Sequence, residues 1–196
     1  MTSTSFVLVI DSSTSILFLG LLNQGQPVDT LVETLDRQQS EWMVPKVISF
    51  LLRHQLKMSD LQAIVVGDGP GSFTGVRLSL TLVKTLGLLK PITVYPISSL
   101  HLFAVDPLSV VWMDARGERM YLGVYEKAKV HVAPMILEMR HKNMIVDAYP
   151  TATWITPASA CQQPNLILSH VASLMQSLTP LKDVHLLNPR YLKDLT

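Results

Sequence analysis

The first part of the chain alternates short apolar runs with polar turns. Residues 6–10 and 16–22 are apolar runs, and a third run with alternating character follows at residues 27–35. The segment NQGQP between the second and third runs is typical of a hairpin turn. This pattern predicts a meander of three β-strands, with a polar tip between the first two.

Two longer segments carry apolar residues at helical spacing. They are residues 40–56 and 73–89, and both are expected to be helices. A short β-branched run at residues 63–66 and a glycine-rich break separate them, and a further short run follows at residues 92–95. These runs are expected to be strands that alternate with the helices.

The second half repeats this plan in a shorter form. We expect strands at residues 110–113, 120–125 and 130–137, then a poorly patterned region, a strand at residues 166–168 and a helix at residues 171–178. The order βββαβαβ is thus followed by a shorter βββ…βα. The repeat predicts two related domains, an N-terminal one at residues 1–105 and a smaller C-terminal one at residues 106–196.

Composition adds a feature that the pattern alone does not show. Apolar residues make up 48% of the 196 residues and charged residues 16%, and the mean hydropathy is +0.30. About 25% charged residues is usual for a globular domain. Some of the apolar surface is therefore expected to face a partner. Residues 40–56 are a candidate, because Trp42 and Phe50 make their apolar surface wider than one core-facing stripe needs.

Several classes of protein are excluded by the same counts. The longest apolar stretches are far shorter than the roughly 20 residues of a membrane-spanning helix. Residues 1–5 have no basic side chain and Asp11 interrupts the next apolar run, so we expect no secretory signal. The formal net charge of +1 does not support autonomous nucleic-acid binding. With one cysteine and no membrane segment, the protein is expected to be cytoplasmic.

The loop after the first strand has the residue types of a phosphate site. Asp11 followed by Ser12, Ser13 and Thr14 could coordinate a magnesium–phosphate complex through its carboxylate, hydroxyls and amides. The alternative is a hydroxyl-rich turn whose side chains bond their own backbone.

A glycine turn precedes the second predicted helix. Gly69, Pro70 and Gly71 match neither the P-loop spacing nor a complete GxGxxG, so they favour a structural turn, with Ser72 or Thr74 capping the helix. Gly75 and Ser79 are four residues apart, which would let another backbone approach the helix closely. A helix interface and an anion site are both open here.

Residues that could hold a metal or carry out hydrolysis are not arranged in any known pattern. None of the six histidines is four residues from another, which excludes a helical metal pair. No GxSxG elbow is present. Cys161 has no histidine close to it in sequence and is expected to be a half-buried thiol. We therefore predict no catalytic residues and no metal site.

Five segments, taken in order, resemble one protein family. They are IDSSTS, RQQSEWMVP, VVGDGPGSFTGVRLSLTLVKTLG, MDAR…MYLGVYE and NPRYLK, of which GPGSFTGVR is the most specific. Together they are similar to the bacterial TsaB (YeaZ) family. The resemblance implies an α/β ASKHA fold, the actin-like ATPase and ribonuclease H-like architecture, with two related βββαβα-type lobes of which the second is reduced.

The resemblance also implies a function in tRNA modification. In that family TsaB is the non-catalytic partner of TsaD, its metal-bearing paralogue, which transfers a threonylcarbamoyl group to adenosine 37 of tRNA, and the ATPase TsaE joins them. The implied chain has no cofactor of its own, because ATP and a divalent metal belong to the partner subunits. It meets tRNA only indirectly, through the complex.

The resemblance assigns roles to particular positions. The family interface is a bundle of the first two long helices, which implies these contact residues: Trp42, Met43, Val47, Phe50, Leu51, Phe73, Thr74, Gly75, Arg77, Leu78, Ser79 and Leu82. The loop at residues 11–14 corresponds to the phosphate loop of the fold but lacks its glycine, so it is expected to be vestigial. The chain departs from the family at Gln39, usually histidine, and at Arg119, usually Glu or Gln.

Other functions stay open. A glycoprotease-like peptidase would need the absent metal pair. An ASKHA-type ATP-dependent phosphotransferase would need a glycine-bearing phosphate loop. An exposed apolar face could also form a homodimer when the partner is absent.

Overall fold

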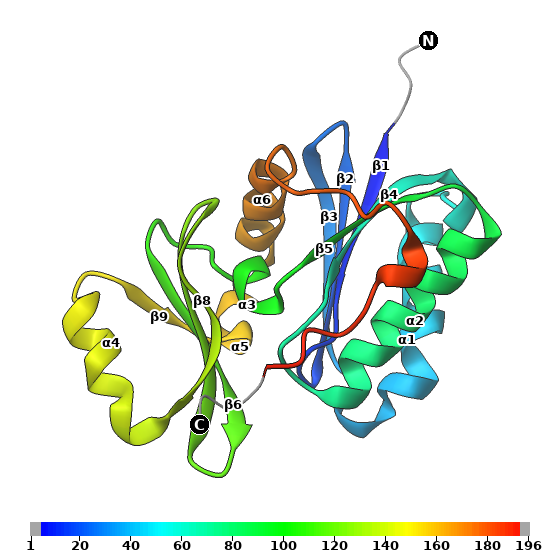
Figure 1. Cartoon of the computed structure of the whole chain (residues 1–196). Helices are drawn as coiled ribbons and strands as arrows, with labels where there is room; N and C mark the ends of the chain where they lie inside the picture. Colours follow the sequence, from blue (N-terminus) through cyan, green and yellow to red (C-terminus); the bar gives the residue numbers. More distant parts are fainter. Residues whose placement is uncertain (1–4, 193–196) are drawn as a thin grey trace.

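The computed structural model describes residues 5–192 and shows two mixed α/β lobes side by side (Figure 1). The first sheet contains β1 (Phe6–Asp11), β2 (Ile16–Asn23), β3 (Gln26–Thr34), β4 (Leu61–Gly67) and β5 (Thr93–Ile97). Their spatial order is β3-β2-β1-β4-β5, with β1, β2 and β3 antiparallel and β1, β4 and β5 parallel. The predicted meander is confirmed.

The central strands β1, β2 and β4 are buried on both faces, which explains their nearly unbroken apolar sequences. In β2, Leu17, Leu19 and Leu21 face α1 (Gln39–Arg53) and α2 (Phe73–Leu89), whereas Phe18 belongs to a second core on the opposite face. The two helices pack on the sheet through apolar side chains at helical spacing. These are Met43, Val47, Phe50 and Leu51 of α1, and Val76, Leu80 and Val83 of α2.

The second lobe repeats the strand order of the first. It contains β6 (Ser109–Arg116), β7 (Arg119–Glu126), β8 (Lys129–Glu138), α4 (Lys142–Ala148) and β9 (Thr153–Ile155), with sheet order β8-β7-β6-β9. The helix α4 and its neighbours cover one face through a small core around Leu122. The fold is therefore of the ASKHA type, with two βββαβα-like lobes and a reduced second lobe, as predicted.

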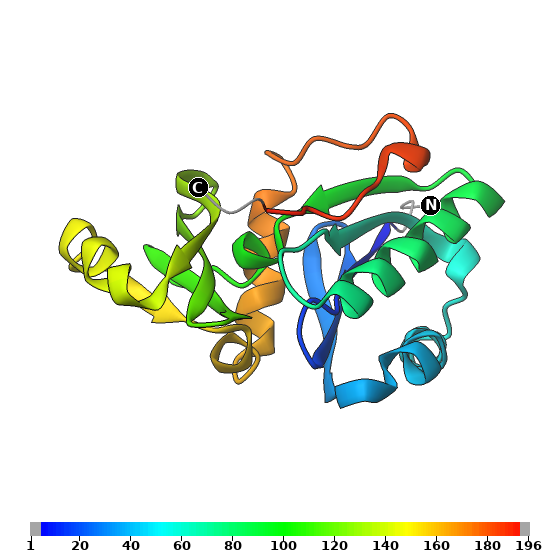
Figure 2. The same ribbon diagram turned by 60° about the horizontal axis from the view of Figure 1, so that its bottom comes forward.

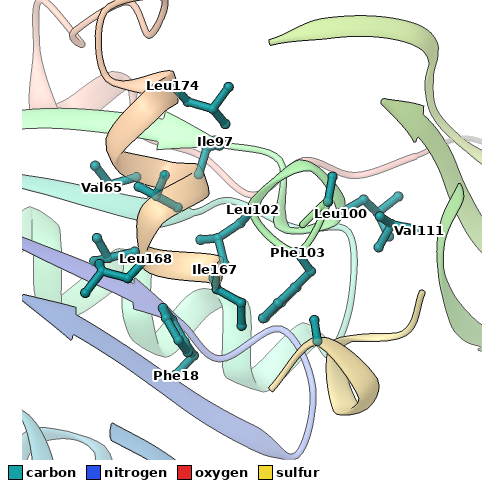
Figure 3. Close-up of a cluster of buried hydrophobic side chains, with 14 of the residues drawn as sticks. Phe18, Val65, Ile97, Leu100, Leu102, Phe103, Val111, Ile167, Leu168 and Leu174 are labelled. Atoms are coloured by element: carbon teal, nitrogen blue, oxygen red, sulfur yellow. The ribbon is translucent and has the colours of Figure 1, made fainter. Parts of the chain in front are cut away.

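A shared core joins the lobes (Figure 3). It contains Phe18 of the first lobe, Val111 of the second, and side chains of α3 (Ser99–Leu102), α5 (Pro157–Ala160) and α6 (Pro164–Leu174). The predicted strand at residues 166–168 is wrong, because α6 runs through it. A run of apolar residues this short has no strand-specific periodicity, and the spacing of Ile167, Leu168, Val171 and Leu174 is helical.

The C-terminal segment returns to the first lobe. The helix α6 packs on the first sheet, where a Cβ atom at Gly20 would lie 2.6 Å from Leu168 Cδ1. Residues beyond α6 then cross to the α2 side, and Leu187 is buried in the core under α1 and α2 (Figure 2). The division into domains at residues 105 and 106 stays a prediction, since the later part of the chain contributes to both lobes.

Single 3₁₀ turns complete the described chain. They lie at Asp36–Gln38, Met58–Asp60, Met139–His141 and Val184–Leu186.

Candidate functional site

The hydroxyl loop (residues 11–15) is folded inward at the end of β1. Asp11 is fully buried and accepts hydrogen bonds from the Ser13 amide at 2.9 Å, Ser13 Oγ at 2.7 Å and Ser99 Oγ at 2.6 Å. Burial raises the pKa of Asp11, and these hydrogen bonds oppose the rise. Ser12 Oγ donates to the carbonyl oxygen of Gly75 at 2.8 Å. The side chains that suggested a phosphate site are therefore bonded within the protein.

Glycines allow the hydroxyl loop to come this close. A Cβ atom at Gly75 would overlap the carbonyl oxygen of Ser12, and one at Gly71 would overlap that of Ser13. The close approach predicted at Gly75 is thus made by the chain's own loop. Ser79 is also fully buried, and its hydroxyl donates to Val76 O at 3.0 Å.

Gln39 joins the same loop to α1. It is 5% exposed, and its Nε2 donates to the carbonyl oxygen of Thr14. A polar side chain therefore has a structural role at the position where the family usually has histidine.

The glycine turn (residues 67–72) leads into α2. Gly69 has φ +101° and Gly71 has φ +153°, and Ser72 caps the helix by accepting the amide of Gly75 at 3.3 Å. Arg190 closes the turn from outside through an ion pair with Asp68. The sequence analysis assigned no role to Asp68 or Arg190, because residues so far apart in the chain show no local pattern that pairs them. The family-like segment NPRYLK, which contains Arg190, was the one available signal.

A cleft of about 1420 Å³ separates the lobes beside this loop. From the first lobe it is lined by Ser13, Thr14 and Phe73 among others, and from the second by Trp112, Arg116 and Tyr121 among others. Of the hydroxyl loop, Ser13, Thr14 and Ser15 line the cleft, whereas Asp11 and Ser12 do not. Thr14 of the first lobe and Arg116 of the second are among the polar groups that line the cleft.

The predicted interface residues of α1 and α2 fall into two groups by their solvent exposure. Trp42, Phe73, Thr74 and Arg77 are exposed, and Leu78 and Leu82 are half-buried. The remaining six are buried within the protein: Met43, Val47, Phe50, Leu51, Gly75 and Ser79. The core of the first lobe holds these six, so in this fold they lie beneath the surface.

An apolar row that sequence reasoning missed lies on the exposed side of α1. Val44, Ile48 and Leu52 are 43%, 44% and 59% exposed, and we call them the α1 stripe. Their spacing of four residues places them on one helix face, next to the buried stripe. The signal was present, because a helix with apolar residues on two faces has one face left after packing.

In residues 5–192, no group of three or more His, Cys, Asp or Glu side chains is placed to hold a metal ion. Among the helices of this range, none combines the length and apolar composition required to cross a membrane.

Comparison with known proteins identifies the family. The Bacillus subtilis tRNA threonylcarbamoyladenosine biosynthesis protein TsaB is 30% identical over 177 residues, which cover 88% of this chain and 74% of that protein. The chain belongs to the TsaB (YeaZ) family. A model described as TsaD, tRNA N6-adenosine threonylcarbamoyltransferase, also matches residues 33–152.

A second TsaB protein matches a shorter region, and a solved YeaZ structure matches nearly all of the chain. The Escherichia coli TsaB protein is 31% identical over 128 residues, which are 62% of this chain and 55% of that protein. The solved structure of YeaZ from Pseudomonas aeruginosa has a TM-score of 0.77 at 21% identity, covering 96% of this chain and all of that one. This likeness shows that both lobes share the fold of that structure.

Proposed function

We propose that this TsaB-family protein takes part in threonylcarbamoyladenosine biosynthesis as a non-catalytic subunit. In this role it supports a TsaD-type paralogue, together with a TsaE-type ATPase, in the transfer of a threonylcarbamoyl group to adenosine 37 of tRNA. The names of the relatives support the pathway. The role within it is inferred from the surface and the loop described above.

The α1 stripe carries the proposal. Val44, Ile48 and Leu52 expose an apolar row on α1, and Trp42 of the same helix is itself 41% exposed. Exposed apolar side chains aligned along a helix mark a surface that another helix can cover. We propose that a TsaD-type paralogue covers it, since such a partner has related helices available for an antiparallel or crossed bundle.

The hydroxyl loop supports the non-catalytic part of the proposal. Phosphate-binding loops present amides and hydroxyls to the ligand. Here the Ser12 and Ser13 hydroxyls are hydrogen-bonded to Gly75 and Asp11, and both serines are at most 2% exposed. Because these hydroxyls are already hydrogen-bonded within the protein, they favour a structural role for the loop over phosphoryl transfer.

Reconstitution tests the proposed function. Purified TsaD-type and TsaE-type proteins of the same organism, an adenylate-forming enzyme, ATP, threonine, bicarbonate and unmodified tRNA are combined with and without this chain. We expect transfer only in the complete mixture, and none from this chain alone. Full activity without the chain would contradict the proposal.

A charged substitution in the α1 stripe links the activity to the surface. Ile48→Glu should abolish both complex formation and transfer, because the mutated side chain is exposed and its charge would be buried in the interface. Ser49→Glu places the same charge on a neighbouring exposed position and is the control. Equal losses in both variants would point to a general effect of charge instead. Metal-dependent peptide cleavage or phosphoryl transfer by this chain alone would favour the peptidase or kinase alternatives.

A further inference from the structure

The C-terminal strap (residues 181–192) follows α2 on the outside of the first lobe (Figure 2). The amide of Leu181 donates to Val94 O on the edge strand β5 at 2.8 Å. Val184 packs against Gly87, where a Cβ atom would lie 2.8 Å from Val184 Cγ2. Leu187 is buried at 2% exposure. The strap is thus anchored beside the C-terminal end of α2 and in the core below it.

Arg190 fixes the strap to the glycine turn at the other end of α2. Its amide donates to Asp68 O at 2.7 Å, while Nε and Nη2 donate to the two carboxylate oxygens of Asp68 at 3.0 and 2.9 Å. The Asp68 side chain is only 9% exposed. A bidentate pair fixes orientation as well as distance. Since the turn leads directly into α2, the pair holds the first turn of that helix.

The next residue of the strap reaches the exposed surface. Tyr191 stacks on Phe73, with ring centroids 6.1 Å apart and an interplanar angle of 26°. The Arg77 guanidinium carbon lies 4.8 Å from the centroid of the Phe73 ring. Tyr191 and Phe73 are 62% and 60% exposed. Stacked aromatic rings beside an arginine are the residue types that most often dominate binding at protein interfaces.

This aromatic cluster and the α1 stripe lie on two helices that pack side by side. Gln39, at the start of α1, approaches the first turn of α2 so closely that a Cβ atom at Gly75 would lie 2.9 Å from its Oε1. Trp42 follows one turn later on α1. A partner that covers the exposed sides of both helices would therefore meet Phe73, Arg77 and Tyr191 at one end.

We propose that the strap is part of the partner-binding face. Tyr191 contacts the TsaD-type partner together with Phe73 and Arg77, and Arg190 is a positioning residue that holds the first turn of α2 in its binding geometry. The occupant is the partner named above, so the inference rests on the proposed function.

Affinity measurements with the full-length variants and the purified TsaD-type protein test the contact. Tyr191→Ala should weaken binding at least tenfold, and Tyr191→Phe, which keeps the ring, should bind within twofold of the unaltered chain. Leu166→Ala removes an apolar side chain that is 45% exposed on α6, away from α2, and is the matched control. Tyr191 is exposed, so its replacement should leave the thermal midpoint unchanged.

Hydrogen exchange of the isolated chain tests the positioning role. Arg190→Met should speed amide exchange in residues 69–77 at least tenfold and weaken partner binding, while amides of α6 stay protected as before. Arg190→Lys keeps the charge but loses the bidentate geometry, so its exchange rates and its affinity for the partner should lie between those of the unaltered chain and of Arg190→Met. Unchanged exchange in the Arg190→Met variant would overturn the positioning role.

The outcomes separate this inference from the proposed function. If Ile48→Glu abolishes binding while Tyr191→Ala binds like the unaltered chain, the strap contact is wrong and the proposed function stands. If the unaltered chain does not bind the TsaD-type protein, the proposed function fails and the strap contact fails with it. If Tyr191→Ala binds at least tenfold more weakly while Tyr191→Phe keeps its affinity, the result supports both the strap contact and the proposed function.

Discussion

Gly75 lies where the first turn of α2 meets the hydroxyl loop, and it has no room for a side chain. A methyl group there would overlap the carbonyl oxygen of Ser12, which is backbone and cannot rotate away. We expect Gly75→Ala to lower the free energy of unfolding by about 2 kcal/mol, as overpacking commonly does. Chemical denaturation measures this. Thr74→Ala, at the neighbouring exposed position, should change stability by less than about 0.5 kcal/mol.

His170 gives the shared core a pH dependence. Its Nε2 donates to His101 O at 3.0 Å, and burial lowers the pKa of His170 to about 4, although this hydrogen bond opposes the shift. The unfolded chain binds a proton near pH 6.5, so between pH 6.5 and 4 it holds more protons than the native state. The contribution of His170 to the free energy of unfolding is therefore fully present above pH 6.5 and is lost as the pH falls. Between pH 7 and pH 5 this loss amounts to about 2 kcal/mol.

His170→Gln isolates this contribution. A glutamine amide can still donate to His101 O but does not titrate. Between pH 7 and 5 its free energy of unfolding should fall by less than that of the unaltered chain. Asp11 acts in the opposite sense, because its raised pKa favours the native state at low pH, but it is common to both proteins and cancels in the difference. Parallel pH profiles would contradict the assignment to His170.

At the scale of elements, α1 has two apolar faces with different tasks. Leu51 is 1% exposed and Leu52 is 59% exposed, so two adjacent residues of one type sample both faces. Leu51→Ala should lower the free energy of unfolding by about 3 kcal/mol, through lost burial and a cavity. Leu52→Ala should change it by less than about 0.5 kcal/mol but weaken the proposed partner complex several-fold. The paired measurement is denaturation and partner affinity, and the reverse pattern would show that the faces are misassigned.

Helical periodicity placed α1 and α2 but could not say which apolar stripe faces inward. Met43 and Val47 are as apolar as Val44 and Ile48, and both pairs have helical spacing. Only the position of the sheet decides between them. The same reasoning explains α6, where a short apolar run was compatible with strand or helix until its packing on Gly20 was known.

For the whole molecule, the cleft between the lobes raises the question of nucleotide binding. The cleft is large, but Asp11 and Ser12 do not line it and are hydrogen-bonded to Ser99 and Gly75. We therefore expect the isolated chain to bind Mg·ATP with a dissociation constant above about 100 μM, which corresponds to a binding free energy weaker than about 6 kcal/mol. Isothermal titration measures this. A dissociation constant below 1 μM would contradict a vestigial loop and revive the phosphotransferase alternative.

The sequence by itself determined the succession of strands along the first lobe, the two long helices, the repeat in the second half and the family. These depend on local periodicity, on turn residues and on a contiguous motif, all of which are present along the chain. Tertiary structure alone decided that Gly75 accommodates the chain's own hydroxyl loop, that Val44, Ile48 and Leu52 form the free face of α1, and that Arg190 closes the turn at Asp68. The physical reason is that each of these features depends on contacts between segments far apart in sequence. The type of a residue does not indicate which distant segment will pack against that residue.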